Sequence, residues 1–240
     1  FLALCTSNLP DVAVVPSEHF NPVLYTGNGG TQSITGFGFQ PDWIWDKSRN
    51  QTGSHMLVDA VRGVGKYLRT NLTSAEGVDS SILTSFDSDG VTVGDINGNA
   101  SSSSSVMWGW KANGSGSSNT NGSINSTVSV NTDAGFSIVS WTQTGYTDSV
   151  GHGLSKTPDM IILKSRSATT ANWWVYTNTG GTGKGLVLNN TSAMQTSSYI
   201  FPTVDSTKFI QGAEVYSGGS NVTYIAYCFH SVDGYSKVGS

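Results

Sequence analysis

The stretch "FQPDWIWDKSRN", residues 39–50, returns later in the chain as "KTPDMIILKSRS", residues 156–167. Each copy has Pro-Asp, then four residues of which at least three are apolar or aromatic, then Lys-Ser-Arg. Such a run between polar residues is typical of a β-strand. The second copy replaces both Trp residues and Asp46 but keeps the two ends. The phrase therefore indicates a duplicated strand rather than a duplicated ligand site.

Other landmarks keep the same order in both halves of the chain. Phe20 aligns with Phe136, the Gly-Lys pair at 65–66 aligns with that at 183–184, and Trp108 aligns with Tyr227. The offsets all lie between about 116 and 119 residues. Self-similarity at a fixed period is the sequence signature of repeated structural units. The chain therefore contains an internal repeat.

The composition fixes the fold class. Charged residues make up only 12% of the 240 residues, and seven Trp and nine Tyr are present. Short segments rich in β-branched and aromatic residues alternate with turn residues along the chain. Repeats of this length with many strands predict an all-β protein of two tandem β-sandwich modules, jelly-roll-like in character.

The repeat also sets the expected domain boundaries. The phrase "AGFSIVS" near the start of the second repeat resembles "DGYSKVG" at residues 233–239, so we expect a third repeat to begin there and the gene product to continue. The Gly-, Ser- and Asn-rich stretch between the repeats reads as a linker whose second half could be a strand. The expected divisions are an N-terminal segment 1–19, which could end a preceding domain, module 1 at 20–114, the linker at 115–133, module 2 at 134–233, and the third start at 234–240.

Charge and cysteine content exclude several classes of function. The net charge is −4 and the 12 Lys and Arg residues form no basic stripe, which argues against nucleic-acid binding. No apolar run approaches the 18 residues that a membrane helix needs. The two cysteines, Cys5 and Cys228, are too far apart to suggest a disulfide framework, and Cys228 lies in an alternating apolar run typical of a buried residue.

Alternation along the strands assigns the aromatic side chains to faces. Trp43 and Trp45 share one face of their strand, as do Trp108 and Trp110 of theirs. Their counterparts in the second repeat are Met, Ile, Tyr and Phe. Because positions that accept these apolar residues are typical of a core, the four tryptophans are expected in the core rather than on a ligand platform.

Trp173 differs from these residues because it aligns with His55, which indicates an outer face. An exposed Trp suggests contact with a partner. Trp173 and His55 are therefore the candidate residues for binding a glycan or a protein partner. A subunit contact or a second packed layer are the open alternatives.

Nothing in the sequence forms a catalytic or cofactor motif. Asp87, Asp89 and Asp95 weakly resemble a calcium loop, but a Val-Thr-Val strand interrupts it, so a hairpin turn is expected. Asp42 and Asp159 recur too regularly to be a glycosidase pair and are expected to fix the turn after the preceding proline. We expect no enzyme, no catalytic residue, no cofactor and no metal site, although a triad assembled in space stays open.

The phrases "GFQPDWIWDKSRN", "LTSFDSDGVTVG", "VMWGWKANG" and "GFSIVS" together resemble repeat modules of large virion-associated proteins of tailed phages, notably marine phages and cyanophages. In those proteins a concanavalin-like or SPRY-like domain often precedes the modules. The resemblance covers nearly all of residues 5–240 and transfers no catalytic residue. It implies a location at the virion surface or outside the cell, in a tail fibre or a similar appendage.

The expected function is therefore structural and adhesive. Host-surface glycans or proteins and other virion proteins are the expected partners, and fibres usually gain avidity by forming homo-oligomers, for which a trimer is a guess from the class. A capsid decoration or extracellular filament protein is the first alternative. A polysaccharide depolymerase is the second.

Overall fold

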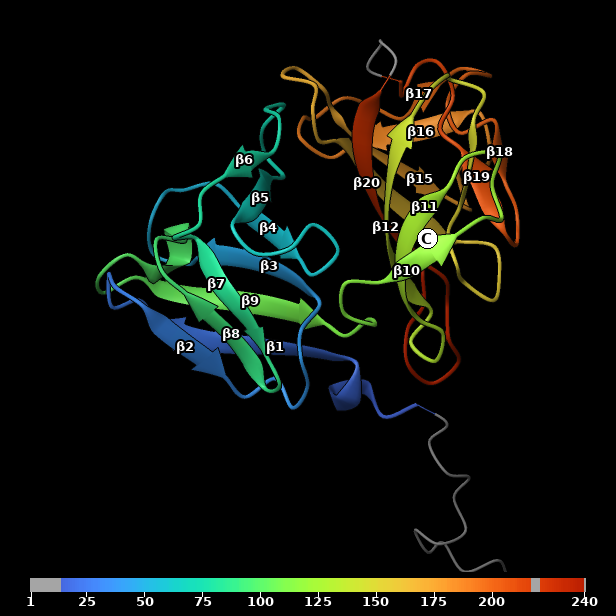
Figure 1. Ribbon diagram of the computed structural model, residues 1–240. Coiled ribbons are helices and arrows are strands. Elements are labelled where there is room, and N and C mark those ends of the chain that lie inside the picture. The colour runs from blue at the N-terminus through green and yellow to red at the C-terminus, as the bar shows by residue number, and fades with distance from the viewer. Residues whose placement is uncertain (1–13, 217–220, 240) are drawn as a thin grey trace, which may run out of the picture.

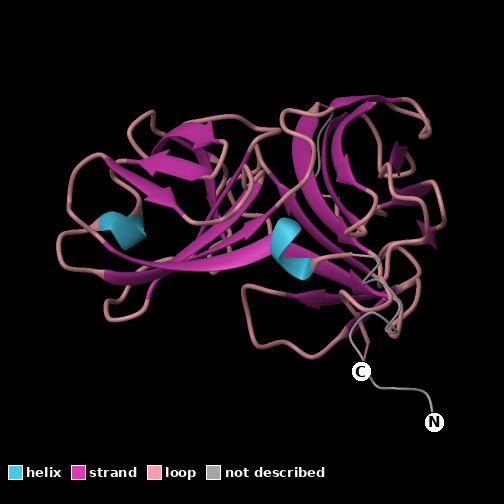
Figure 2. Ribbon diagram, turned by 90° about the horizontal axis from the view of Figure 1, so that it is seen from below, coloured by secondary structure: helices cyan, strands magenta, loops and turns pink. Residues whose placement is uncertain are grey.

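The computed structural model describes residues 14–216 and 221–239. The regular secondary structure of the described residues is almost wholly antiparallel strand, with short 3-10 turns at Pro16–Glu18 and Asn97–Asn99, and loops connect the strands, as Figure 2 shows. The prediction of an all-β protein is confirmed. Residues 1–13, and with them Cys5 and most of the expected N-terminal segment, lie outside the described residues.

Module 1 contains a large sheet of order β1-β9-β3-β4-β5-β6 and a small sheet of order β2-β8-β7. Short polar turns separate its strands, which supply one apolar face to the space between the two sheets. The strands are β1 (Phe20–Thr26), β2 (Gln32–Thr35), β3 (Trp43–Ser48), β4 (Met56–Asp59), β5 (Lys66–Arg69), β6 (Gly77–Val78), β7 (Leu83–Asp87), β8 (Gly90–Val93) and β9 (Ser104–Trp110).

Module 2 contains a large sheet of order β10-β11-β12-β20-β14-β15-β16-β17 and a small sheet of order β13-β19-β18. Its strands are β10 (Ser117–Asn119), β11 (Ser126–Asn131), β12 (Phe136–Gln143), β13 (Ser149–Gly151), β14 (Met160–Ser165), β15 (Trp173–Thr177), β16 (Lys184–Val187), β17 (Gln195–Thr196), β18 (Thr203–Val204), β19 (Lys208–Ile210) and β20 (Val222–Phe229).

The two modules share one topology, so the internal repeat is a repeat of the fold. Strands β12-β20-β14-β15-β16-β17 follow one another in module 2 as β1-β9-β3-β4-β5-β6 do in module 1. The quoted phrases supply β3 and β14, which occupy equivalent central places in the two sheets. Figure 1 shows the modules side by side, module 1 in blue to green and module 2 in yellow to red.

The stretch 115–133 is part of module 2 rather than a free linker. Its second half forms β11, as expected, and β11 pairs with β12 along six residue pairs from Ser126↔Trp141 to Asn131↔Phe136. Its first half contains β10, which pairs with β11. The expectation of a linker there is wrong, because alternating polar residues and Val in β11 fit the edge of the large sheet and the polar β10 pairs with β11 in turn.

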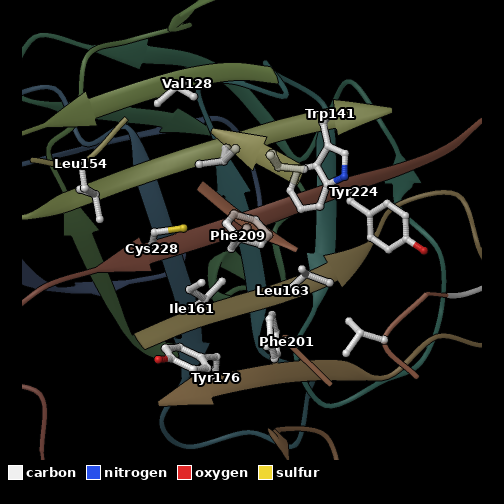
Figure 3. Packing of buried hydrophobic residues seen from close by; sticks show 14 of the residues in the cluster. Val128, Trp141, Leu154, Ile161, Leu163, Tyr176, Phe201, Phe209, Tyr224 and Cys228 are labelled. Carbon is white, nitrogen blue, oxygen red and sulfur yellow. The ribbon is translucent and has the colours of Figure 1, made fainter. Parts of the chain in front are cut away.

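Each module has its own apolar core between its two sheets. In module 1 the inward residues include Ile44, Met56 and Val58. Figure 3 shows the corresponding core of module 2, where Cys228 lies among aromatic and aliphatic side chains. Burial raises the pKa of the Cys228 thiol to about 12, so the thiol is neutral and packs as a small apolar group, as expected.

A third core joins the modules, because their large sheets also carry apolar residues on the outer faces. Trp43 of β3 stacks on Tyr227 of β20 with ring centroids 4.3 Å apart, and on Phe136 of β12 at 5.6 Å. Leu57 and Leu68 of module 1 lie in the same cluster. We call this cluster the inter-module core.

The Pro-Asp phrases form a repeated latch. Asp42 accepts a hydrogen bond from the backbone N–H of Ala112 at 2.7 Å, and Asp159 accepts one from Ser231 at 2.6 Å. Both bonds tie the entry of a central strand to the chain just beyond β9 or β20. Besides the expected role in the turn after the proline, the carboxylates therefore bridge 70 and 72 residues of sequence.

The end of the described chain lies against the inter-module core. Val232 and Ser236 form an isolated bridge, and Tyr235 meets His19 edge to face at 5.9 Å. Gly234 has a positive φ of 77°, as the aligned Gly135 does at 63°, so both positions use a backbone conformation that favours glycine. The expected third repeat stays a prediction.

Candidate functional site

An aromatic groove opens on the outer face of the large sheet of module 1. It has a volume of about 330 Å³ and is lined by Phe20, Trp45, Trp108 and Trp110, all of which are half-buried. We call these four residues the aromatic groove. Cross-strand pairing creates it, since Phe20 and Trp110 lie opposite each other on β1 and β9, as Trp108 and Trp45 do on β9 and β3.

The rings of the groove meet at steep angles. Trp45 and Trp108 are nearly perpendicular, at 82°, with centroids 6.5 Å apart, and Phe20 lies 4.8 Å from Trp110. Edge-to-face and tilted contacts of this kind are the favoured arrangements of aromatic pairs. The aromatic side chains therefore fix one another's orientation, and the groove presents apolar surface for contact.

His55 lies at the edge of the groove, beside Trp45. The indole Nε1–H of Trp45 donates a hydrogen bond to His55 Nδ1 at 2.9 Å, so a neutral ring carries its own proton on Nε2. Burial, and secondarily the charge of Lys47, lowers the pKa of His55. At neutral pH the imidazole is therefore uncharged and fixes the orientation of Trp45. Of the two residues predicted to bind a partner, His55 is the one near an open surface.

The expectation that four tryptophans lie in the core holds for one of them. Trp43 is buried in the inter-module core. Trp45, Trp108 and Trp110 are instead half-buried and form the groove. Sequence reasoning missed this because the two faces of β3 and β9 are both apolar, and only the placement of module 2 decides which part of the outer face is covered.

The expectation that Trp173 is exposed is wrong. Its side chain is 0% exposed and lies in the inter-module core. Its indole Nε1–H donates to the backbone carbonyl of Arg69 in module 1 at 2.9 Å. Strand register supports the alignment with His55, because Met56, next to His55, pairs with Asp46, and Trp174, next to Trp173, pairs with the equivalent Leu163. The outer face was assigned correctly, but in module 2 that face is covered by module 1.

A buried polar network crosses the inter-module core. Tyr227 Oη donates to Asp59 Oδ2 at 2.8 Å, and Asp59 pairs with the guanidinium of Arg62. All three side chains are buried, and Arg62 also donates to the carbonyl of Leu57 at 3.0 Å. Burial, together with the neighbouring Asp59, raises the pKa of Tyr227 well above its ordinary value, so its proton stays in place. Buried charges are tolerated where they are paired and hydrogen-bonded in this way.

Glu76 extends this network to Arg166 of module 2. Arg166 donates two hydrogen bonds to the Glu76 carboxylate, Nε to Oε2 and Nη2 to Oε1, each at 2.9 Å. Arg62 reaches the same carboxylate at 3.3 Å. Burial raises the pKa of Glu76, but the bonds and charges of Arg166 and Arg62 more than offset this, so the pKa lies below its ordinary value. The carboxylate is therefore ionised and bridges two guanidinium groups.

Lys164 also reaches across the join. Its ammonium donates to the carbonyl of Thr73 in module 1 at 2.8 Å and to Ala171 at 2.6 Å. Burial lowers the pKa of Lys164 to about 8. In module 1 the aligned Lys47 donates instead to Ser48 and Gln51, close to its own strand. Only the second Lys-Ser-Arg phrase therefore holds the two modules together.

A polar hollow of about 250 Å³ opens on the outer face of module 2, beside the ion pair of Arg166. Hydroxyl groups dominate its lining, with one amide and one guanidinium among them. We call it the hydroxyl hollow; its lining residues are Ser118, Asn125, Ser126, Thr127, Ser140, Trp141, Thr142, Arg166 and Thr223.

Two of the three aspartates of the candidate calcium loop, Asp87 and Asp89, lie at the hairpin of β7 and β8, whereas Asp95 follows β8 and its backbone N–H donates to the carbonyl of Ser81. Asp87 accepts a bond from Thr92 Oγ1 at 2.8 Å, and Asp89 accepts bonds from the backbone of Gly36 and Gly38. Asp87 and Gly90 pair across the expected two-residue turn. Within residues 14–216 and 221–239, no three His, Cys, Asp or Glu side chains are grouped to hold a metal ion.

Asp59, Arg62 and Glu76 were not identified from the sequence. Their roles depend on Tyr227 and Arg166, which lie far away in the chain, and the second repeat has Thr177, Gly180 and Met194 where these three align. The absence of charged residues at the aligned positions of the second repeat is the sequence signal that could have identified these three residues. It indicates that the two modules perform different tasks at the join.

Comparisons with known proteins give a family. None of the described helices is long and apolar enough to cross a membrane. No curated protein and no solved structure matches the chain. A family described as "Domain of unknown function (DUF7483)" matches residues 15–240, a range that includes both modules and the join between them. The chain therefore belongs to the DUF7483 family.

Proposed function

We propose that this chain is a structural and adhesive building block of a phage particle, part of a tail fibre or similar surface appendage. It presents its β modules at the virion surface to glycans or proteins of the host. The sequence resemblance to virion-associated repeat modules motivates this proposal. It acts without catalysis and without a cofactor.

The observation that carries the proposal is the way in which the modules are joined. Interfaces between domains of one chain usually allow relative motion unless they are large and apolar. Here Trp43, Trp173 and Tyr227 are buried between the modules, and Arg166 and Glu76 add a bidentate ion pair. Such a join makes the pair a rigid unit, as an appendage that transmits mechanical force requires.

The hydroxyl hollow is the surface that best suits adhesion. Sugar hydroxyls both donate and accept hydrogen bonds, as the Ser and Thr hydroxyls of the hollow do. The low content of charged residues, 12%, keeps such a surface neutral toward polysaccharides. Thr127 and Thr142 are exposed there and are available for contact.

A purely structural role, in a capsid decoration or an extracellular filament, is the second candidate and is favoured by the same rigid join. A depolymerase is less well supported. Glycoside hydrolysis uses two carboxyl groups across a groove, and the residues that line the hydroxyl hollow and the aromatic groove include none. Release of new reducing ends from host polysaccharide would establish that activity.

Two measurements test the proposal. Gold-labelled antibodies against the protein, imaged on intact phage particles, should mark a tail fibre or another appendage, whereas an even label over the capsid would support decoration. Fluorescent protein should bind host cells, and Thr142→Lys, which fills the hydroxyl hollow, should reduce that binding at least tenfold. Thr84→Lys, at an exposed strand position of module 1, is the matched control. Equal binding by both variants would remove the hollow from the proposal.

A further inference from the structure

The aromatic groove occupies the same place in module 1 that the docked face occupies in module 2. Strand order and pairing establish this equivalence, because β1, β9 and β3 match β12, β20 and β14. In register, Phe20, Trp45, Trp108 and Trp110 correspond to Phe136, Ile162, Tyr227 and Phe229.

In module 2 this face is covered by protein. Phe136, Ile162 and Tyr227 are buried in the inter-module core, in contact with Trp43 and its neighbours. The fold therefore uses this face of its large sheet to pack against another module. In module 1 only part of the equivalent face is covered: Trp43, Leu57 and Leu68 lie in the inter-module core, with Trp45 and Trp110 packed against it. The part toward β1 remains in contact with solvent.

The open face is larger than the groove and continuous with the inter-module core. Pro22 and Leu24 of β1 lie directly opposite Trp108 and Val106 and extend the apolar surface along the strand. Leu24 is 65% exposed. At the other end, Trp110 lies 4.3 Å from Trp43, which belongs to the inter-module core. The established interface thus runs without a break into the uncovered face.

We propose that this face, formed by the aromatic groove with Pro22 and Leu24, is the contact surface for the same face of a second copy of the chain. A two-fold contact brings each patch against its own copy, which is the commonest symmetry of soluble oligomers. None of these side chains carries a charge, so self-contact creates no repulsion. Contiguous exposed apolar surface of this kind marks an interaction site.

Contact through the face is favoured over pairing of strand edges. β1 ends the large sheet, and a proline within an edge strand lacks the N–H that a further strand would need. Pro22 stands in the middle of β1. The two copies therefore pack face to face, as the two modules do within the chain, rather than extend one sheet.

Sedimentation velocity of the 240-residue chain from about 1 to 100 μM tests this inference, because mass action governs dimer formation over such a range. The wild type should change from one species of 25.3 kDa to one of twice that mass. Leu24→Lys should remain monomeric at every concentration. Because Leu24 is an exposed position, this change should leave the near-ultraviolet circular dichroism spectrum unaltered.

Two further variants complete the design. Trp108→Glu should also prevent dimer formation, and Val78→Lys, at an apolar position 76% exposed on β6, should dimerise like the wild type. A wild type that stays monomeric throughout would overturn the inference, as would dimers that persist in Leu24→Lys. Monomeric protein whose tryptophan fluorescence responds to host polysaccharide, with the response lost in Trp108→Glu, would assign the face to a glycan instead.

The biological role of this contact rests on the proposed structural function, but the contact itself is tested by a separate experiment. If Leu24→Lys abolishes the dimer but antibodies do not label phage particles, the contact surface is supported and the appendage role is contradicted. If antibodies label an appendage but the chain stays monomeric, the appendage role is supported and the contact surface is contradicted.

Discussion

Tyr227 in module 2 donates a hydrogen bond to Asp59 in module 1, across 168 residues of sequence and with both side chains buried. Removing only the hydroxyl, as in Tyr227→Phe, leaves the stacking of the ring on Trp43 and deprives a buried carboxylate of one donor. We expect the free energy of unfolding to fall by about 1–3 kcal/mol. Urea denaturation followed by circular dichroism measures this, with Tyr146→Phe at a site 52% exposed as the control. Equal stabilities would mean that Arg62 alone satisfies Asp59.

Substitutions at Trp173, on the module 2 side, also test the inter-module core. Trp173→Ala should lower the free energy of unfolding by about 3–5 kcal/mol, because it leaves a cavity between the modules. Trp173→Phe should cost less, since it keeps most of the apolar volume and loses the bond from Nε1 to Arg69. Thermal unfolding of both variants beside the wild type gives the ranking. Unchanged stability in Trp173→Ala would contradict the burial of this residue.

Asp46 predicts a pH dependence. Burial raises its pKa to about 6, despite the bonds that it accepts from Tyr25 Oη at 2.7 Å and from the N–H of Gly98 at 3.1 Å. Between the ordinary carboxyl pKa and pH 6, the folded protein binds a proton that the unfolded chain has released. The stabilising contribution of Asp46 is therefore present below about pH 4 and lost as the pH rises through 6.

The measurement for Asp46 is a difference, because other carboxylates also titrate. The free energy of unfolding of Asp46→Asn minus that of the wild type should rise from pH 4 to pH 7, since Asn cannot ionise. Any constant cost of the amide cancels in the slope. A difference that is flat over this range would show that Asp46 keeps an ordinary pKa.

The latch predicts two matched effects at distant places. Asp42→Ala should free the N–H of Ala112, and Asp159→Ala should free that of Ser231. Each variant should lose about 1–3 kcal/mol, as expected when a charged acceptor of a backbone donor is removed. Amide hydrogen exchange should accelerate at residue 112 in the first variant and at residue 231 in the second. Asp133→Ala, at an exposed turn, should change neither amide.

The duplicated fold could be predicted from the sequence because each strand is identified by residues that are adjacent in the chain. The short apolar run between polar ends in "DWIWDKS" and in "DMIILKS" identifies a strand wherever the segment lies, and the order of such segments identifies the repeat. The entry phrase Pro-Asp is the same in both repeats because both modules use the same latch. Asp42 and Asp159 illustrate this, although the length of sequence that each bridges was not foreseen.

The candidate site could not be predicted in the same way. Trp45 and Trp173 both lie on the outer face of a large sheet, yet one lines a groove and the other is buried. Alternation gives the face of a strand but not what covers that face. The covering depends on how one module packs on the other, and the residues responsible, such as Arg62 and Tyr227, are more than 160 residues apart.

The pairing of β11 with β12 has a mechanical consequence. If the stretch 115–133 were a slack tether, a pull along the chain would be taken up by its extension before either module felt the force. Six consecutive residue pairs instead fasten this stretch to the sheet, so the load passes at once into a ladder of hydrogen bonds. The join cannot act as a spring, and tension applied to module 1 is transmitted directly to module 2.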